Sequence, residues 1–151
     1  MPAVPSLDLD GLPEWPPGTV AILSTGAGAP HAIPVSTAVR AGERRVLLAL
    51  GRRRESLERL REEPRVALTV LAEGGVALTA HARAEVVQDP MEVSDRVVAV
   101  ALNVDRIQDH DQPRFEIEAG VRWRWTDEDA ERADGEIRAA LASLAGRSAA
   151  A

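Results

Sequence analysis

Three consecutive arginines, Arg52, Arg53 and Arg54, give the strongest chemical signal in the sequence. They stand where a predicted strand ends and a short predicted helix at residues 51–63 begins. The N–H groups at a helix N-terminus favour an anion, and arginine side chains bind phosphate with paired hydrogen bonds. Ser56 could add a hydroxyl. The pattern indicates an anion site, and the alternative is a solvated run of charge that pairs with neighbouring glutamates.

The three histidines give weaker signals. His81 falls on the polar face of a predicted strand. His110 lies between two aspartates, where it is either part of a site for a hard metal ion or part of a solvated loop. No spacing typical of a zinc site is present, so we predict no metal site. His31 opens a predicted strand that contains Pro34, and it either has a structural role or touches a ligand.

The composition removes several kinds of chemistry. The chain has 151 residues and no cysteine, which excludes disulfides, thiolate metal ligands and cysteine nucleophiles. It has no tyrosine, and all 18 basic residues are arginine, so neither a Schiff base nor a phenolic acid is available. No Ser-His-Asp arrangement can be identified either. We therefore assign no catalytic residue, and whether the protein is an enzyme stays open.

Charge and hydropathy bear on partners and location. The net charge of −6 argues against general binding to nucleic acid. No apolar run approaches the roughly 18 residues that would cross a membrane, and Asp8 and Asp10 stand where a signal peptide needs an apolar core. We expect a cytoplasmic protein with no nucleic-acid or membrane partner.

Short apolar runs separated by turn residues predict antiparallel strands. These runs lie at residues 20–24, 31–39, 45–50, 66–70, 76–87, 98–104 and 115–125, although residues 91–101 alone also fit a helix. Pro34 within the second run suggests an edge strand, a bulge or a place where a ligand replaces a neighbouring strand. Trp123 and Trp125 share one face of the last run, where they either fill the core or form a wall of a pocket.

Two helices complete the pattern. Residues 51–63 fit one short amphipathic helix, and a second is expected to start at Thr126, with Asp129 at the capping-box position, and to end at Gly146. The chain is thus mainly β: a six- to seven-stranded antiparallel barrel with a short helix after strand three and a C-terminal helix.

The order of these motifs resembles a known family. The segments at 20–25 (VAILST), 30–36 (PHAIPVS), 46–50 (VLLAL) and 57–68, which ends in PRVAL, look like the pyridoxamine 5'-phosphate oxidase-like flavin-binding split barrels. The resemblance covers residues 18–88 well and 89–126 loosely. It implies a split-barrel flavin-binding-like domain at 19–126. The five prolines of residues 1–18 predict an irregular N-terminal arm, and the pattern after the barrel predicts a C-terminal helix at 127–147 and a tail at 148–151.

The resemblance also implies a cofactor site. Members of the family are homodimers with two cofactor sites at the subunit interface. The flavin ring lies along the second strand, and its phosphate meets the end of strand three and the helix start. Carried onto this chain, with Trp125 as a pocket wall, the candidate cofactor-binding residues are Ile33, Pro34, Val35, Ser36, Arg52, Arg53, Arg54, Ser56 and Trp125.

Some family features are missing. An Arg-Lys pair that members often carry before the PRVAL-type segment falls here on Glu55 and Ser56, and a phosphate-binding threonine or serine falls near Leu50. The expected function is an FMN-binding oxidoreductase of unknown substrate. The alternatives are a deazaflavin-dependent reductase and a non-catalytic split barrel that binds a small anion, haem or another ligand.

Overall fold

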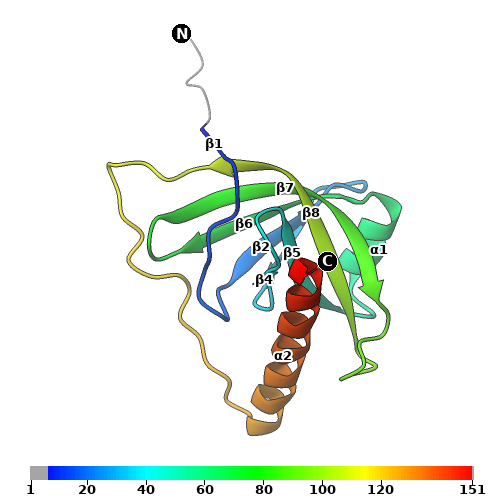
Figure 1. Cartoon of the computed structure of the whole chain (residues 1–151). Helices are drawn as coiled ribbons and strands as arrows, with labels where there is room; N and C mark the ends of the chain where they lie inside the picture. Colours follow the sequence, from blue (N-terminus) through cyan, green and yellow to red (C-terminus); the bar gives the residue numbers. More distant parts are fainter. Residues whose placement is uncertain (1–6, 151) are drawn as a thin grey trace.

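The computed structural model describes residues 7–150, with side chains to residue 147, and its main feature is one antiparallel sheet curled into a half-barrel (Figure 1). The strands follow the order β3-β2-β6-β7-β8-β5-β4, and β1 adds to β8. Their bounds are β1 Asp8–Leu9, β2 Ala21–Thr25, β3 His31–Val35, β4 Val39–Arg40, β5 Arg45–Gly51, β6 Arg65–Ala72, β7 Val76–Gln88 and β8 Val97–Asp109. The predicted mainly β antiparallel fold is confirmed.

Alternation of apolar and polar residues places one face of each strand in the barrel interior. In register, Val66, Leu68 and Val70 of β6 lie opposite three inward-facing residues of β7. All of these are nearly inaccessible and belong to one core cluster, to which β2, β5 and β8 also contribute. A tight turn joins β6 to β7, in which Gly74 and Gly75 have φ of 82° and 78°, values that glycine adopts without strain.

The neighbouring strands β8 and β5 are buried on both faces. Alternate residues of each strand face the barrel core, and those between them face α2 (Glu128–Ala150), which crosses the outside of the sheet (Figure 1). Leu141 of α2 is fully buried there, against Leu47 of β5 and the small residues Ala99 and Ala101 of β8. This explains why β5 and β8 are nearly continuous apolar runs.

The short helix α1 (Glu55–Glu62) lies between β5 and β6, as predicted. Leu57 and Leu60, three residues apart, are its buried apolar residues and belong to the barrel core. Its charged residues remain at the surface. The helix thus fixes the position of the arginine cluster, which immediately precedes it at the end of β5.

The predicted strand at residues 115–125 is wrong for this chain. These residues leave β8 and run to α2 without joining the sheet. The alternating pattern suits a strand, but a strand also needs a neighbour for its backbone hydrogen bonds. No strand of the described chain supplies one. The region at 91–101 is a turn followed by the start of β8 at Val97, and so is not helical.

Two predicted boundaries also change. The helix α2 starts at Glu128 and is capped by Asp127, whose Oδ1 accepts from the Asp129 N–H at 2.9 Å, and not by Thr126. It continues through Gly146 into the predicted tail as far as Ala150, since an exposed helical glycine costs only about 1 kcal/mol. Residue 151 lies outside the described residues.

The predicted N-terminal arm is more ordered than expected over the residues that the structure describes. It contributes β1 to the sheet, and Trp15 packs against the core and donates from Nε1 to the Ala38 carbonyl at 3.0 Å. Leu12 is buried, and its N–H reaches the Glu43 carbonyl at 2.8 Å. The arm's residues 1–6 lie outside the described part of the chain.

Candidate cofactor site

Pro34 lies on an edge strand. In the described sheet β3 pairs only with β2, where Pro34 stands opposite Ile22, and its other side has no strand neighbour. Proline lacks the N–H that a central strand needs, so it is tolerated at this edge. The prediction of an edge strand is confirmed, and β3 leaves one side of its backbone available to a ligand or to another chain.

A small hollow lies beside this edge. It has a volume of about 140 Å³ and is lined by residues 33–37 from β3 and its continuation, and by Ala49, Leu50, Gly51 and Arg54 from the end of β5 and the start of α1. The structure thus brings together five of the nine predicted residues, Ile33, Pro34, Val35, Ser36 and Arg54. They come from two separate parts of the sequence.

Leu50 offers no hydroxyl to this hollow, but Thr37 lies across from it. The Thr37 hydroxyl accepts from the Ala49 N–H at 3.0 Å, and so links the chain after β3 to β5. Thr37 was not among the predicted lining residues. Its role here is to hold the two sides of the hollow together.

A second, larger hollow contains the arginine cluster. It measures about 980 Å³ and is lined by Gly51, Arg52, Arg53, Arg54, Asp95 and Arg96. Four arginines therefore face one aspartate. Gly51 and Arg54 line both hollows, so the positively charged hollow adjoins the one beside β3.

The four arginines differ in their pairing. Arg52 contacts Asp89 at 3.5 Å and donates to the Asp95 carbonyl at 3.4 Å, so its guanidinium holds the β7–β8 connection. The side chains of Arg53, Arg54 and Arg96 have no hydrogen-bond or ion-pair partner among the described residues. Neither Arg53 nor Arg54 pairs with the glutamates of α1, so both guanidinium groups are exposed to solvent and open to an anion.

Asp95 and Arg96 were not predicted. They stand just before β8, where the pairing of Gly51 with Val97 brings them next to the arginine cluster. The Arg52 N–H donates to the Arg96 carbonyl at 2.9 Å. The signal that would have found them is the pairing of β5 with β8, and the apolar pattern of two strands does not say which strands are neighbours.

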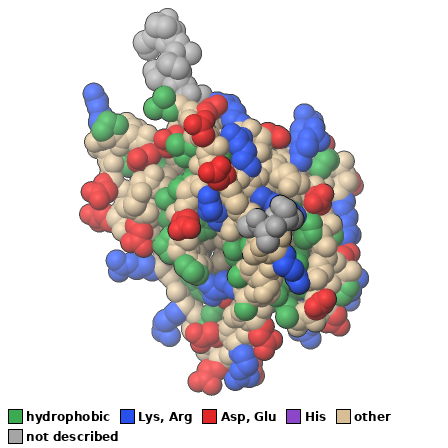
Figure 2. Space-filling model, viewed as in Figure 1, with side chains coloured by type: hydrophobic (Ala, Val, Ile, Leu, Met, Phe, Trp, Pro, Cys, Tyr) green, Lys and Arg blue, Asp and Glu red, His purple; other side chains and the backbone are tan. Residues whose placement is uncertain are grey.

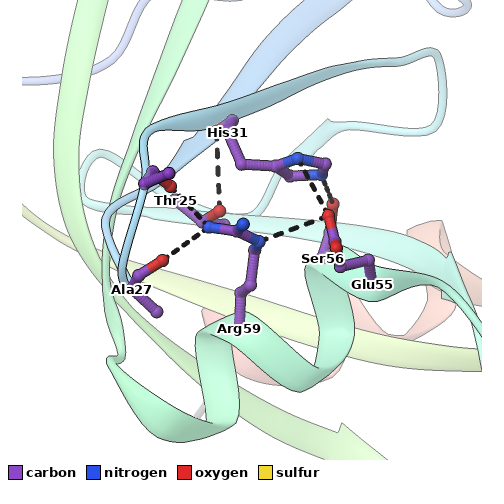
Figure 3. A network of polar contacts seen from close by, with 7 residues as sticks. Thr25, Ala27, His31, Glu55, Ser56 and Arg59 are labelled. Carbon is purple, nitrogen blue, oxygen red and sulfur yellow. Dashed lines mark hydrogen bonds and ion pairs between the residues drawn. The ribbon is translucent and has the colours of Figure 1, made fainter.

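Ser56 lies in a polar network, not in either hollow (Figure 3). Ser56 is 1% exposed, and its Oγ lies 3.2 Å from Nε2 of His31. The other ring nitrogen of His31, Nδ1, lies 3.1 Å from Oε2 of Glu55. Glu55 also pairs with Arg59, which donates to the carbonyls of Ala27 and Ala29 in the β2–β3 turn. In this chain His31 and Ser56 join β3 to α1.

Trp125 lies apart from the other eight predicted residues. With Trp123 it lines a third hollow of about 670 Å³, between the N-terminal arm and α2. The two rings meet edge to face with their centroids 5.4 Å apart, and both side chains are about one third exposed. Trp125 Nε1 lies 3.4 Å from the buried carboxylate of Asp134. The tryptophans therefore form a pocket wall and are not core residues.

The remaining histidines take part in surface hydrogen bonds. His110 Nε2 lies 2.8 Å from the hydroxyl of Thr79, and His81 Nε2 lies 3.3 Å from Oε1 of Gln108. Within the described residues no three acidic or histidine side chains gather in a way that could hold a metal ion. Nor does either helix of the described chain have the length and apolarity needed to span a membrane.

Solved structures share this fold. A candidate pyridoxamine 5'-phosphate oxidase from Listeria innocua is 17% identical, with a TM-score of 0.53 over 62% of this chain and 90% of its own. An F420 reductase is 13% identical, with a TM-score of 0.54 over 62% and 91%. General Stress Protein 26 from Bacillus anthracis is 13% identical, with a TM-score of 0.50 over 70% and 90%. No protein-family model and no curated protein matches the sequence.

Proposed function

The chain has the split-barrel fold of the pyridoxamine 5'-phosphate oxidase-like proteins, and on that basis we propose that it binds a flavin-type cofactor and acts as an oxidoreductase. FMN is the cofactor we favour. The observation that carries the proposal is the position of Arg54, which lines both the hollow beside β3 and the arginine hollow. A ligand with a flat ring and a phosphate needs these two surfaces side by side.

In this arrangement the ring lies along the open edge of β3, beside the backbone of Ile33–Ser36, and the phosphate meets Arg53 and Arg54. Both guanidinium groups are exposed and unpaired within the described chain, so they can bind an anion without breaking an existing ion pair. Arg52 contributes through its charge, because its guanidinium is already engaged by Asp89.

The size of the hollow beside β3 supports a homodimer. Its volume of about 140 Å³ is well below the roughly 300–1,000 Å³ of sites that enclose a cofactor. A second copy of the chain seated against this edge would supply the missing wall. We therefore place the cofactor between two protomers, as the sequence resemblance also implies.

The cofactor supplies the redox chemistry of the proposed reaction. This fits a chain in which the candidate residues around β3 are apolar or backbone groups and the charged ones are arginines, which bind anions but do not exchange protons near neutral pH. The protein's own part is to bind, orient and shield the ring.

Two alternatives have specific support. A deazaflavin coenzyme is favoured by the similarity in fold to the F420 reductase. A non-catalytic binding protein is favoured by Leu50 and Glu55, which replace a hydroxyl and a basic residue that the resemblance would place near the phosphate, and by Ser56, whose hydroxyl is already bonded to His31.

The test compares FMN with riboflavin, which lacks the phosphate. A charge-assisted hydrogen bond contributes about 1.5–3 kcal/mol, so R53A/R54A should weaken FMN binding by about ten- to a hundredfold. Riboflavin binding should hardly change. The control R83A/R147A removes two exposed arginines away from both hollows and should leave FMN binding as it is.

Titration of the parent protein with FMN and with a deazaflavin coenzyme, followed by fluorescence, separates the two cofactors. Reduction of the bound cofactor by a nicotinamide donor would support an enzyme, and tight binding without turnover would support the non-catalytic alternative. If neither cofactor binds at tens of micromolar, the proposed function is wrong.

A further inference from the structure

Residues 115–125, which we call the strap, have the sequence of a β-strand but no strand partner. The strap leaves β8 and runs along the outside of the molecule to α2 (Figure 1). Within the described chain, residues 116–125 make no backbone–backbone hydrogen bond. Its middle residue, Gly120, lies against β6, where an added Cβ would come within 3.0 Å of the Leu71 carbonyl. The strap is held to its own chain at Gly120 and at Trp123, whose Nε1 donates to the Gly18 carbonyl at 2.9 Å, and its backbone has no strand neighbour in the described chain.

The strap exposes large apolar side chains. All of its residues except Ile117 are exposed, including Val121 at 65% and Phe115 at 42%. Three of the four aromatic residues of the whole sequence lie in this segment. Large apolar side chains exposed together on one segment of a small protein often mark an interaction site.

The charged residues of the strap are divided by sign along its length. Glu116 and Glu118 come before Gly120, and Arg122 and Arg124 come after it. None of these four side chains has an ion-pair partner in the described part of the chain. Figure 2 shows this order along the left edge, where red side chains are followed by blue ones down the path of the strap.

We propose that the strap is a dimerisation strand, which pairs antiparallel with the strap of a second copy about a two-fold axis at Gly120. In this register, a residue a given number of positions before Gly120 lies opposite the residue the same number of positions after Gly120 in the other copy. Glu116 then faces Arg124 and Glu118 faces Arg122, so every charge meets its opposite. On the other face the pairs are Phe115 with Trp125, Ile117 with Trp123, and Ala119 with Val121.

A second copy fits this surface because the strap is complementary to itself. A two-fold interface requires the same patch to match its own inverted copy, and both the charges and the apolar residues of the strap do so. Cross-strand pairs of aromatic, branched and oppositely charged residues stabilise antiparallel strands. The pairing would also satisfy backbone groups that the described chain leaves without a protein partner.

The proposal concerns the second copy of the proposed function but uses a surface other than the β3 edge, and it does not need a cofactor. Its tests therefore measure association of the cofactor-free protein. Failure of flavin binding would leave the strap proposal standing, and failure of strap pairing would leave the arginine site standing.

Charge reversal gives the first test. In E118R or R122E, two attractive pairs across the axis become repulsive, and the dimer dissociation constant from sedimentation equilibrium should rise about tenfold or more. The double variant E118R/R122E restores opposite charges and should recover the parent value. If the singles have no effect, or if the double variant stays as weak as the singles, the register is wrong. A parent protein of monomer mass at micromolar concentration also overturns the proposal.

Cysteine cross-linking gives the second test, in a chain that has no native cysteine. E118C/R122C places each new thiol opposite the other in the partner, so oxidation should yield a covalent dimer on a non-reducing gel. The control E116C/E118C has the same number of thiols on the same face, but the nearest pair between copies is about 13 Å apart, beyond the reach of a disulfide. Equal cross-linking of both variants would refute the register. The strap would then have another partner, such as a different edge of the second copy or a different protein.

Discussion

The contact between His31 and Ser56 can be tested by a double-mutant cycle. Ser56 is 1% exposed, and among the described residues its hydroxyl contacts only the ring of His31, at 3.2 Å. His31→Phe leaves this buried hydroxyl without a partner, which costs about 1–3 kcal/mol. The lost contact with Glu55, whose side chain is 61% exposed, adds at most about 0.5 kcal/mol. The single variant should therefore lower the free energy of unfolding by about 1–3.5 kcal/mol.

Ser56→Ala should cost less, about 1 kcal/mol, because His31 is one quarter exposed and can bond to water instead. In H31F/S56A both polar partners are gone and no buried group is left unsatisfied. The double variant should consequently lose about 1 kcal/mol less than the sum of the two single variants. Urea denaturation followed by circular dichroism measures all four proteins.

A matched cycle on another hydroxyl contact provides the control. Thr69 and Thr79 face each other across β6 and β7, with their Oγ1 atoms 3.1 Å apart, but both residues are half-buried. Water can replace the lost partner there, so T69V and T79V should be nearly additive. If the His31–Ser56 cycle is also additive within about 0.3 kcal/mol, Ser56 does not depend on His31 and the reasoning fails.

Three further predictions concern α2. Leu141→Ala should lower the free energy of unfolding by about 2–5 kcal/mol in urea, because it leaves a cavity between the helix and β5; an equal loss in the exposed control Leu71→Ala would contradict this. Asp127→Ala should remove the helix cap and cost about 0.5–2 kcal/mol, whereas Asp127→Asn should keep most of it. Asp134→Ala should leave Arg138 without its buried partner and shift tryptophan fluorescence, and an unchanged spectrum would count against the Trp125 contact.

The sequence was sufficient to predict the elements whose side chains alternate between core and surface. Val66, Leu68 and Val70 identify β6, and the Gly74-Gly75 turn identifies its hairpin with β7. The pairing of β5 with β8 was not predictable in the same way. Both strands are buried on both faces, so their sequences are nearly continuous apolar runs that do not indicate which residues lie opposite one another. For this reason Asp95 and Arg96 were missed beside the arginine cluster.

The strand predicted at residues 115–125 failed for a different reason. Its alternating pattern describes the segment's own preference, while a strand exists only together with a partner. The interaction of Ser56 with His31 was equally inaccessible, since it joins residues far apart in the sequence and depends on where α1 sits against β3. The position of the three arginines between the end of β5 and the start of α1 was predictable, because it depends only on local sequence.

The order of strands in the sheet has a consequence for protein synthesis. The strand β5 forms its longest ladder with β8, and β2 takes its second neighbour from β6, so early strands depend on later ones. While the ribosome is still making the middle of the chain, the local β2–β3, β4–β5 and β6–β7 pairings can form, but β5 still lacks β8. The helix α2 has no surface to dock on until β5 and β8 have met. The N-terminal half of this chain therefore completes its fold only after the C-terminal third has emerged, which leaves the apolar face of β5 in need of protection until then.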